Sequence, residues 1–446
     1  MIRYFNVPKK TLFVTLVLML ASRTAGGQVA PEVVASDLRA PQGIAVDERG
    51  WVWVAEQGTG NDDARISVIT PEGEVATFID GMPSNIVQGF PEGAHHLSFR
   101  DGHLWATLGL GEESPDGYLL IVDTTGFTPG QTPLSLEDVD QQEDVATFVI
   151  GHEFDDDTNQ SNIYNLAFGP EDDLFVVDAS ANAVLRRTAE GGDWTVFATL
   201  PPVANPTPVG PPMSQAVPTG IVYDGERLLV SCLPGFPMPD GEGRILELGS
   251  DGSTSLLVSG LTTVVDLQLS PRGDLVASQF GAFSLESGFA ANAGSIVRID
   301  GTEIDTLVTG LSHPAGIAFG PGGDLYVTAM TDGQVLKVDA GAIGTSAEDP
   351  QTVPETFTLL PNYPNPFNPG TTLAYRLAQP EHISLSVYNL LGQEVRLLVD
   401  TRQPAGAYEV RWNGRDRDGR PMPSGVYLYR LRAGDRVQSR TMHLIK

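Results

Sequence analysis

The chain contains a single cysteine, Cys232, so no disulfide can form within it. Its stability must therefore come from the burial of apolar side chains rather than from cross-links. Cys232 stands in the apolar stretch of residues 228–233. Because reactive cysteines need a polar, electropositive setting, the sequence predicts that Cys232 is a small core residue.

Long apolar runs are also absent. The apolar run near the N-terminus covers only residues 12–21. It follows Arg3, Lys9 and Lys10 and precedes small residues up to Gly27. A membrane-spanning helix needs about 20 apolar residues, so this run is too short to be one. A basic start, a short apolar stretch and a small-residue exit predict a secretory signal peptide over residues 1–27. The signal peptide implies an exported protein, and no later stretch is long and apolar enough to span a membrane, so we expect the mature protein to be soluble.

Basic side chains are scarce in the middle of the chain. The chain has 27 basic and 56 acidic residues. Residues 1–27 contain four basic and no acidic residues, and residues 355–446 contain 12 basic and 8 acidic residues. Residues 28–354 therefore contain 11 basic and 48 acidic residues, a net charge of −37. Such a surface repels phosphate backbones, which excludes nucleic acid as a partner. Two interpretations stay open: a surface kept soluble by carboxylates, or one that attracts cations or basic partners.

A repeat occupies this acidic region. Each copy has an apolar strand, a tight turn with Gly or Asp and a second apolar strand, followed by a third and usually a fourth strand. Six copies begin near residues 40, 92, 161, 216, 264 and 313. Four short strands per repeat are typical of a propeller blade. We therefore predict an all-β protein with a six-bladed β-propeller over residues 28–344.

The sixth copy lacks its fourth strand. No counterpart of residues 305–311 (DTLVTGL) follows it, but residues 32–38 (EVVASDL) have the same pattern. An N-terminal strand that completes the last blade would close the ring and cover two sheet edges.

The repeat motif P-x-G-I-A, followed by D-x-x-G and an apolar strand, resembles NHL-type six-bladed propellers. Residues 33–63 and the following EGAHHLSF are similar to the ScyD/ScyE family, which is associated with scytonemin biosynthesis. The resemblance covers about residues 30–345. It implies a six-bladed propeller in an exported protein and does not imply a particular reaction, so whether the chain is an enzyme stays open.

One face of the propeller is the candidate binding face. The loops between first and second strands are all tight, whereas those between second and third strands are long and varied. Variable loops on a rigid frame are where binding surfaces are built. The alternative is that these loops vary in length and sequence without a binding function.

The starts of the first strands should line the central channel at that face. They form two columns: Gly43, His96, Asn165, Gly220, Asp266 and Gly316 in one, and Gln42, His95, Tyr164, Thr219, Val265 and Ala315 in the other. The glycines would leave space in the channel, and the side chains of His96, Asn165 and Asp266 would converge on that space. His96, Asn165 and Asp266 could hold Ca²⁺ or another divalent cation, or Asp266 could act as a base beside His96. The alternative is a polar plug in a wet channel.

Gluconolactonase-type propellers are a further comparison. Such lactonases bind calcium through an acidic, asparagine-rich ring at comparable strand starts. Here Gln42 stands where that family would place an acid. The lactonase activity is therefore not carried over from the resemblance.

The tail differs in composition. Residues 345–356 form a polar, proline-bearing linker, and residues 357–446 show short alternating strands that predict an Ig-like sandwich. The motif Tyr363, Pro364, Asn365, Pro366, Phe367 and Asn368, with VYN at 387–389 and GVY at 425–427, resembles the type A sorting domain of type IX secretion. Residues 412–427 also resemble the FlgD-type Ig-like module. The resemblance implies an address read by an outer-membrane translocon; an adhesive Ig-like module is the alternative.

Two hypotheses about function follow. The first is a secreted or cell-surface scaffold, expected to be monomeric, that binds a small molecule or carbohydrate and is exported by type IX secretion. The second is a divalent-cation-dependent hydrolase or lactonase with its site in the channel.

Overall fold

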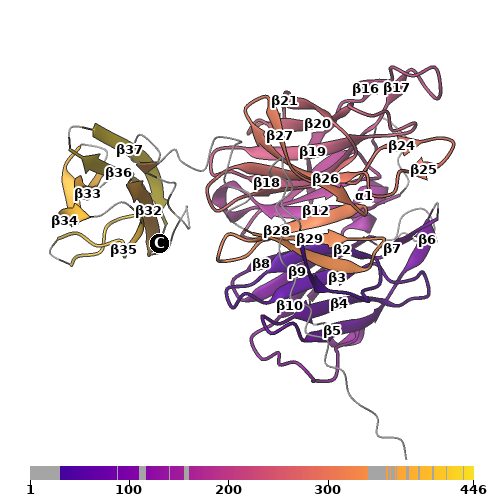
Figure 1. Ribbon diagram of the computed structural model, residues 1–446, viewed down its shortest axis with the longest axis horizontal. Helices are drawn as coiled ribbons and strands as arrows, with labels where there is room; N and C mark the ends of the chain where they lie inside the picture. The colour runs from indigo at the N-terminus through magenta and orange to yellow at the C-terminus, as the bar shows by residue number, and fades with distance from the viewer. Residues whose placement is uncertain are drawn as a thin grey trace, which may run out of the picture.

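The computed structural model describes residues 31–339, apart from residues 88, 110–116, 140 and 155–159, and most of residues 358–445 (Figure 1). Within the second part it leaves out residues 360–361, 363–366, 368, 378–380, 390–391, 404–405, 418 and 435. The predicted signal peptide and the predicted linker over residues 345–356 lie outside the described residues.

The predicted all-β class is confirmed. Among the described residues the only α-helix is α1 (Ala146–Gly151), and two short 3-10 turns accompany it, η2 (Leu136–Asp138) and η3 (Pro170–Asp172). None of these helices is long or apolar enough to cross a membrane.

Six four-stranded antiparallel sheets fill residues 32–338. The first three comprise β2 (Pro41–Val46), β3 (Val52–Glu56), β4 (Ala64–Ile69) and β5 (Val75–Met82); β8 (Ala94–Arg100), β9 (His103–Gly109), β10 (Gly117–Asp123) and β11 (Gln141–Asp144); and β12 (Ile163–Phe168), β13 (Leu174–Asp178), β14 (Ala183–Arg187) and β15 (Thr195–Thr199). The next two comprise β18 (Ala216–Tyr223), β19 (Leu228–Pro234), β20 (Gly243–Leu248) and β21 (Thr254–Leu261); and β22 (Val264–Leu269), β23 (Leu275–Gln279), β26 (Gly294–Asp300) and β27 (Glu303–Leu311). The last comprises β28 (Pro314–Phe319), β29 (Leu325–Ala329), β30 (Gln334–Val338) and β1 (Glu32–Ala35).

The innermost strands of these sheets form a closed ring. Strand β2 contacts β8, β8 contacts β12, and the series continues through β18, β22 and β28 back to β2. Sheets arranged radially around a shared axis in this way make a β-propeller.

Strand β1 closes the ring, as the sequence predicted. Glu32 pairs with Lys337 and Ala35 with Val335, so the first strand of the described chain is the outer strand of the last sheet. The pairing covers an edge of β30 that would otherwise offer free backbone groups to other chains.

Apolar side chains fill the space between neighbouring sheets. Trp53 is fully buried and meets the rings of Phe78, Phe99 and Phe127 at centroid distances of 5.0, 5.4 and 5.8 Å. Cys232 is likewise 1% exposed, and burial raises the pKa of its thiol to about 12, which confirms that it is a core residue.

A β-bulge recurs at the start of every inner strand. In β2 the pairing passes from Pro41 to Gly43 while the partner strand advances by one residue, and the same shift occurs in β8, β12, β18 and β22. In β28 the pairing passes from Pro314 to Ile317 while the partner strand advances by two residues. The unpaired residues are Gln42, His95, Tyr164, Thr219, Val265 and the pair Ala315 and Gly316. One of the two predicted columns is therefore the column of bulges. A bulge re-aims its side chain relative to the regular pleat.

Three two-stranded hairpins lie along one side of the propeller, at the right in Figure 1. They are β6 (Asn85–Val87) with β7 (Phe90–Glu92), β16 (Val203–Ala204) with β17 (Met213–Ser214), and β24 (Phe283–Ser284) with β25 (Gly288–Phe289). Two of them contribute residues to the candidate site.

The C-terminal part has two sheets and a core of its own. One sheet contains β31 (Thr358–Leu359), β32 (Thr371–Leu377) and β35 (Gly406–Trp412); the other contains β34 (Glu394–Gln403), β33 (Glu381–Asn389), β36 (Gly425–Ala433) and β37 (Arg436–Leu444). Trp412, Tyr375 and Tyr429 are its largest buried side chains. Of the predicted sorting motif only Phe367 is described: it is buried, and its ring lies 5.5 Å from that of Trp412. Tyr363, Pro364, Asn365, Pro366 and Asn368 lie outside the described residues.

Candidate functional site

A chamber of about 170 Å³ lies where the bulged strand starts meet the long loops. Its lining is Gln42, Gln57, Phe90, Pro91, Glu92, His95, Asn162, Tyr164, Leu233, Met238, Thr263, Val265, Phe280, Phe289 and Met330. Four of these are bulge residues, and most of the others come from the loops that follow the second strands or link one blade to the next. The chamber is thus on the face that loop length had indicated.

The walls of the chamber are apolar and largely aromatic. Phe280 follows β23, and its ring lies 4.9 Å from that of Phe289 on β25. Phe90 on β7 reaches Phe289 at 5.8 Å, although it lies on a hairpin from a different part of the chain. Val265 and Met330 pack into the same cluster. Since Phe90 remains 37% exposed, the aromatic wall continues to the surface.

The floor is polar and internally hydrogen-bonded. His95 Nε2 lies 3.0 Å from the carbonyl oxygen of Gly109, which assigns the ring proton to Nε2. His95 Nδ1 then accepts a hydrogen bond from Gln57 Nε2 at 3.1 Å. The His95 ring lies 4.8 Å from that of Tyr164, whose hydroxyl accepts a hydrogen bond from Gln42 Nε2. These contacts hold four polar side chains from three blades in fixed positions.

Burial keeps both ionisable rings of the floor neutral. It lowers the pKa of His95 to about 4, although the hydrogen bonds to Gly109 and Asn162 oppose this. It also raises the pKa of Tyr164, and the carboxylates of Asp266 and Glu92 raise it further. Near pH 7 a ligand in the chamber would therefore meet two neutral rings, beside the side chain of Glu92.

Asn165 and Asp266 meet, as the sequence predicted, but not in the chamber. Asn165 Nδ2 donates to Asp266 Oδ1 at 3.0 Å, and the backbone N–H groups of Leu267 and Ile317 donate to the same carboxylate at 2.8 and 2.9 Å. Burial raises the pKa of Asp266 to about 7. The pair joins β12, β22 and β28, so its geometry is that of a brace between blades.

His96 does not join this pair. Its ring is buried, burial lowers its pKa to about 3, and no hydrogen bond to Asn165 or Asp266 is found among the described residues. Neither His96 nor Asp266, the two candidate catalytic residues, is part of the chamber lining, although each directly follows a lining residue.

The donor set does not fit a divalent cation. Both oxygens of Asp266 already accept hydrogen bonds, and the side-chain oxygen of Asn165 accepts one from the backbone N–H of Leu166 at 2.7 Å. In the described part of the chain no three His, Cys, Asp or Glu side chains are grouped as metal ligands. We derive no chemistry from a metal here.

The channel glycines do not leave room for a ligand, in contrast to the prediction. A Cβ atom on Gly43 would lie 2.2 Å from the carbonyl oxygen of His95, and one on Gly316 would lie 2.5 Å from that of Gln42. The space beside each glycine is taken by the backbone of the next inner strand. These glycines allow neighbouring blades to approach closely.

Hydroxyl groups tie the bulges of adjacent blades together. Thr107 Oγ1 donates to the Tyr164 carbonyl at 3.0 Å, Ser278 Oγ to that of Ala315 at 2.5 Å and Thr328 Oγ1 to that of Gln42 at 2.8 Å. Thr219, a predicted channel residue, donates to the Val264 carbonyl at 2.8 Å and is not part of the chamber lining. The bulge residues above are thus held by a rigid ring.

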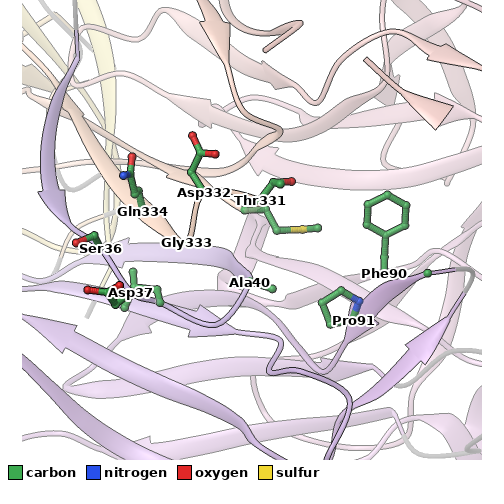
Figure 2. A pocket seen from close by; sticks show the side chains of 12 residues that line it. Ser36, Asp37, Ala40, Phe90, Pro91, Thr331, Asp332, Gly333 and Gln334 are labelled. Atoms are coloured by element: carbon green, nitrogen blue, oxygen red, sulfur yellow. The ribbon is translucent and has the colours of Figure 1, made fainter. Parts of the chain in front are cut away.

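A groove of about 600 Å³ adjoins the chamber (Figure 2). Ser36 and Asp37, which follow β1, lie at one end, and Phe90 and Pro91 lie at the other. Asp332, in the turn between β29 and β30, lines the groove between them. Because Phe90, Pro91 and Met330 line both cavities, the groove is a continuation of the chamber.

The sequence pointed to the face with the long loops and to Gln42, His95 and Tyr164, but not to the aromatic wall. Phe90, Phe280, Phe289 and Met330 come from loops with no repeat to align them. A signal was present in residues 279–294, where three phenylalanines stand in a loop that is otherwise small and polar. Their convergence with Phe90 depends on the closed ring.

Comparisons with known proteins characterise the two parts differently. Residues 366–436 match the family model of the FlgD Ig-like domain, so an Ig-like domain of this kind is present at the C-terminus. No curated protein matches the sequence.

Solved structures resemble the propeller only in fold. Virginiamycin B lyase from Staphylococcus aureus is 17% identical with a TM-score of 0.40, and 68% of this chain and 96% of that chain are covered. PQQ-bound aldose sugar dehydrogenase from Streptomyces coelicolor is 15% identical with a TM-score of 0.43, over 69% and 96% of the chains. Regucalcin, a calcium-binding protein from Agrobacterium tumefaciens, is 13% identical with a TM-score of 0.42, over 69% and 93%. Likenesses at this level give no indication of activity, because one fold hosts many functions.

Proposed function

We propose that residues 28–344 are a six-bladed propeller of the ScyD/ScyE kind that binds a small ligand in the chamber at its channel mouth. The protein is secreted or displayed at the cell surface, and its C-terminal Ig-like domain directs export through the type IX translocon.

The observation that carries the binding function is the combination of an aromatic wall with a fixed polar floor. Small-molecule sites are typically concave and mostly apolar, with a few well-placed polar groups that orient the ligand. Here Phe280 and Phe289 supply the apolar surface, and His95, Tyr164 and Gln42 supply hydrogen-bonding groups already held by their neighbours. A floor that is preorganised in this way costs little ordering when a ligand binds.

The hydrolase hypothesis has less support from the same geometry. A general base must lie within hydrogen-bonding reach of its substrate. Burial raises the pKa of Asp266 to about 7, but its carboxylate accepts hydrogen bonds from three N–H donors, and Asp266 is not part of the lining of either cavity. His95 does face the chamber, but both of its ring nitrogens are hydrogen-bonded and it is a weak base.

Export is supported by both ends of the chain. Residues 1–27 have the pattern of a signal peptide. The tail combines a FlgD Ig-like match with the motif around Phe367, a residue that is packed into the core of that domain.

Methionine-methyl NMR tests the binding function on the mature protein. The sequence contains eight methionines, of which Met238 and Met330 line the chamber and Met442 lies in the core of the C-terminal domain. Titration with benzyl alcohol, a ring with one hydroxyl, should shift the signals of Met238 and Met330 and leave that of Met442 unchanged. Unchanged Met238 and Met330 signals at saturating probe would contradict the proposal.

A filled chamber provides the matched control. Val265→Phe places a ring in the cavity and should abolish the shifts. Leu256→Phe adds the same ring at an exposed position on β21 and should leave them intact. Equal binding by both variants would place the probe elsewhere.

A further inference from the structure

The charges around the two cavities are all of one sign. Glu92 lines the chamber, and Asp37 and Asp332 line the groove. Among the described residues that line either cavity there is no lysine or arginine. A ligand that enters from the groove passes three carboxylates and no fixed cation.

Two basic residues stand next to lining residues in the sequence or in space. Arg39 precedes the lining residue Ala40, but its guanidinium Nη1 is 3.5 Å from Asp63 Oδ2. His313 stacks on Phe280 at 4.7 Å, and burial lowers its pKa although Asp332 opposes this. His95 is neutral for the same reason. Among the described residues that line the two cavities, the acidic side chains thus outnumber the lysines and arginines by three to none.

The aromatic wall favours the same sign of ligand. The faces of aromatic rings attract cations, and the attraction grows when the cation is desolvated. Phe90, Phe280 and Phe289 are arranged edge to face, with interplanar angles of 72°, 77° and 78°, so they present surfaces in several directions. Tyr164 adds a fourth ring at the floor.

The size of the chamber limits the ligand. Its volume of about 170 Å³ is close to that of an engineered apolar cavity of about 150 Å³ that admits benzene. One ring, or a short branched alkyl group, fills it. The groove can receive the remainder of a longer molecule.

We infer that the chamber and the groove bind an organic cation with a compact apolar body, an aryl or alkyl ammonium, and reject anions of the same size. This inference rests on the proposed function, for which it names the ligand class. The net charge of −37 over residues 28–354 acts in the same direction, since it attracts cations toward the molecule and repels anions from it.

The inference also counts against lactone hydrolysis at this site. Water adds to the carbonyl carbon of a lactone, the ring C–O bond breaks, and the product is a hydroxy acid that loses its proton to give a carboxylate. Such a product would form beside Glu92 with no described basic side chain in the lining to stabilise it. An ammonium ligand avoids that repulsion.

A charge series on the wild-type protein tests the inference. The probes are benzyltrimethylammonium, benzyl alcohol and phenylacetate, each titrated by calorimetry and by the methyl signals of Met238 and Met330. The ammonium should bind at least about tenfold more tightly than benzyl alcohol, as expected for a desolvated cation–π contact together with a nearby carboxylate. Phenylacetate should not bind. The preference should shrink as ionic strength rises, because salt screens the groove carboxylates most.

Two variants locate the source of the preference. Glu92→Gln keeps the shape of the side chain and should cut the advantage of the ammonium about tenfold. Glu286→Gln removes one charge from the exposed turn between β24 and β25, outside both cavities, and should change little.

The outcomes separate the two proposals. If benzyl alcohol binds as tightly as the ammonium, or if phenylacetate binds, the ligand class is wrong while the binding function stands. If no probe shifts Met238 or Met330, the binding function is wrong as well. Ammonium binding that survives Glu92→Gln unchanged would also overturn the inference.

Discussion

Glycine at the start of an inner strand sets how closely two blades can approach. The hydrogen that replaces a side chain at Gly43 faces the backbone of His95 and His96, and Gly316 faces the backbone of Gln42 and Gly43. Contacts of this kind recur around the ring, so the width of the channel depends on the absence of a Cβ atom at these glycines.

Gly43→Ala should therefore be strongly destabilising. The added Cβ would lie 2.2 Å from one backbone oxygen and 2.7 Å from a Cα atom, neither of which can move without shifting a strand. Overpacking of this kind costs about 1–3 kcal/mol or more, which urea unfolding followed by tryptophan fluorescence would measure.

Gly322→Ala is the matched control. Nothing lies within 4 Å of a Cβ atom there, and its φ angle is not in the left-handed region. It should be neutral or stabilising by about 0.4–1 kcal/mol, because alanine restricts the unfolded chain. Similar losses in the two variants would refute the close-approach explanation.

Asp266 should give the protein a pH dependence of stability. Its pKa is about 7 in the folded protein and about 3.9 in an unfolded chain. Between these values the folded state binds more protons than the unfolded state, so the contribution of Asp266 to stability falls as pH rises from about 4 to about 7.

Asp266→Asn removes this titration and isolates it. The free energy of unfolding of the wild type, minus that of the variant, should decrease by at least about 1 kcal/mol across that range and level off above about pH 7. Parallel curves for the two proteins would show that Asp266 does not titrate there. Other buried acids, such as Asp178, cancel in the difference because both proteins contain them.

At the residue scale the sequence predicted which side chains meet better than it predicted their hydrogen bonds. It indicated that Asn165 and Asp266 would meet, and they do. It did not show that the backbone N–H groups of Leu267 and Ile317 would occupy the carboxylate; these two donors lie just after the bulges at Val265 and at Ala315 and Gly316. A bulge adds one residue without a sequence signal of its own.

At the scale of elements, β1 is the strand on which the propeller depends. It belongs to the same sheet as β28, whose residues lie almost 300 positions later in the chain, and it covers the edge of β30. Four of the residues that follow it, Ser36, Asp37, Leu38 and Ala40, also line the groove.

Removal of residues 28–37 from the mature protein should expose the β30 edge. We expect a lower unfolding midpoint and concentration-dependent association, both of which light scattering during a thermal ramp would detect. Residues 28–30 precede β1, so their removal alone should leave the unfolding midpoint and the association state unchanged. A monomeric, fully stable longer truncation would contradict the closing role of β1.

The strands of the blades were the feature that the sequence predicted best. The strand–turn–strand repeat identified the first two strands of each blade because tight turns with Gly or Asp separate them. The hairpins β6–β7, β16–β17 and β24–β25 were not predicted, because each occurs once and has no copy to reveal it. Two of them carry Phe90 and Phe289 of the chamber wall, which explains why the site was the less predictable part.

At the scale of the whole molecule, the chain joins two units with separate cores. The buried clusters of the propeller lie within residues 35–338, and that of the C-terminal domain lies within residues 359–444. Their charges also differ: residues 28–354 carry −37, whereas residues 355–446 carry 12 basic and 8 acidic side chains. This separation is what a portable export domain requires.

A fusion tests that portability. Residues 1–27, a fluorescent protein and residues 345–446 should together reach the cell surface or the medium in a bacterium with a type IX system. The same fusion without residues 345–446 should stay in the periplasm, and so should the full fusion when the translocon is deleted. Export that does not need the tail would refute its sorting role.

The central claim, that the channel mouth is a ligand site, is tested most directly by a crystal structure of the mature protein soaked with benzyltrimethylammonium. The account expects density for the ligand inside the chamber, with its ring against Phe280 and Phe289 and its ammonium on the side of Glu92. A chamber without ligand density at saturating concentration, or a ligand bound only outside the two cavities, would contradict it.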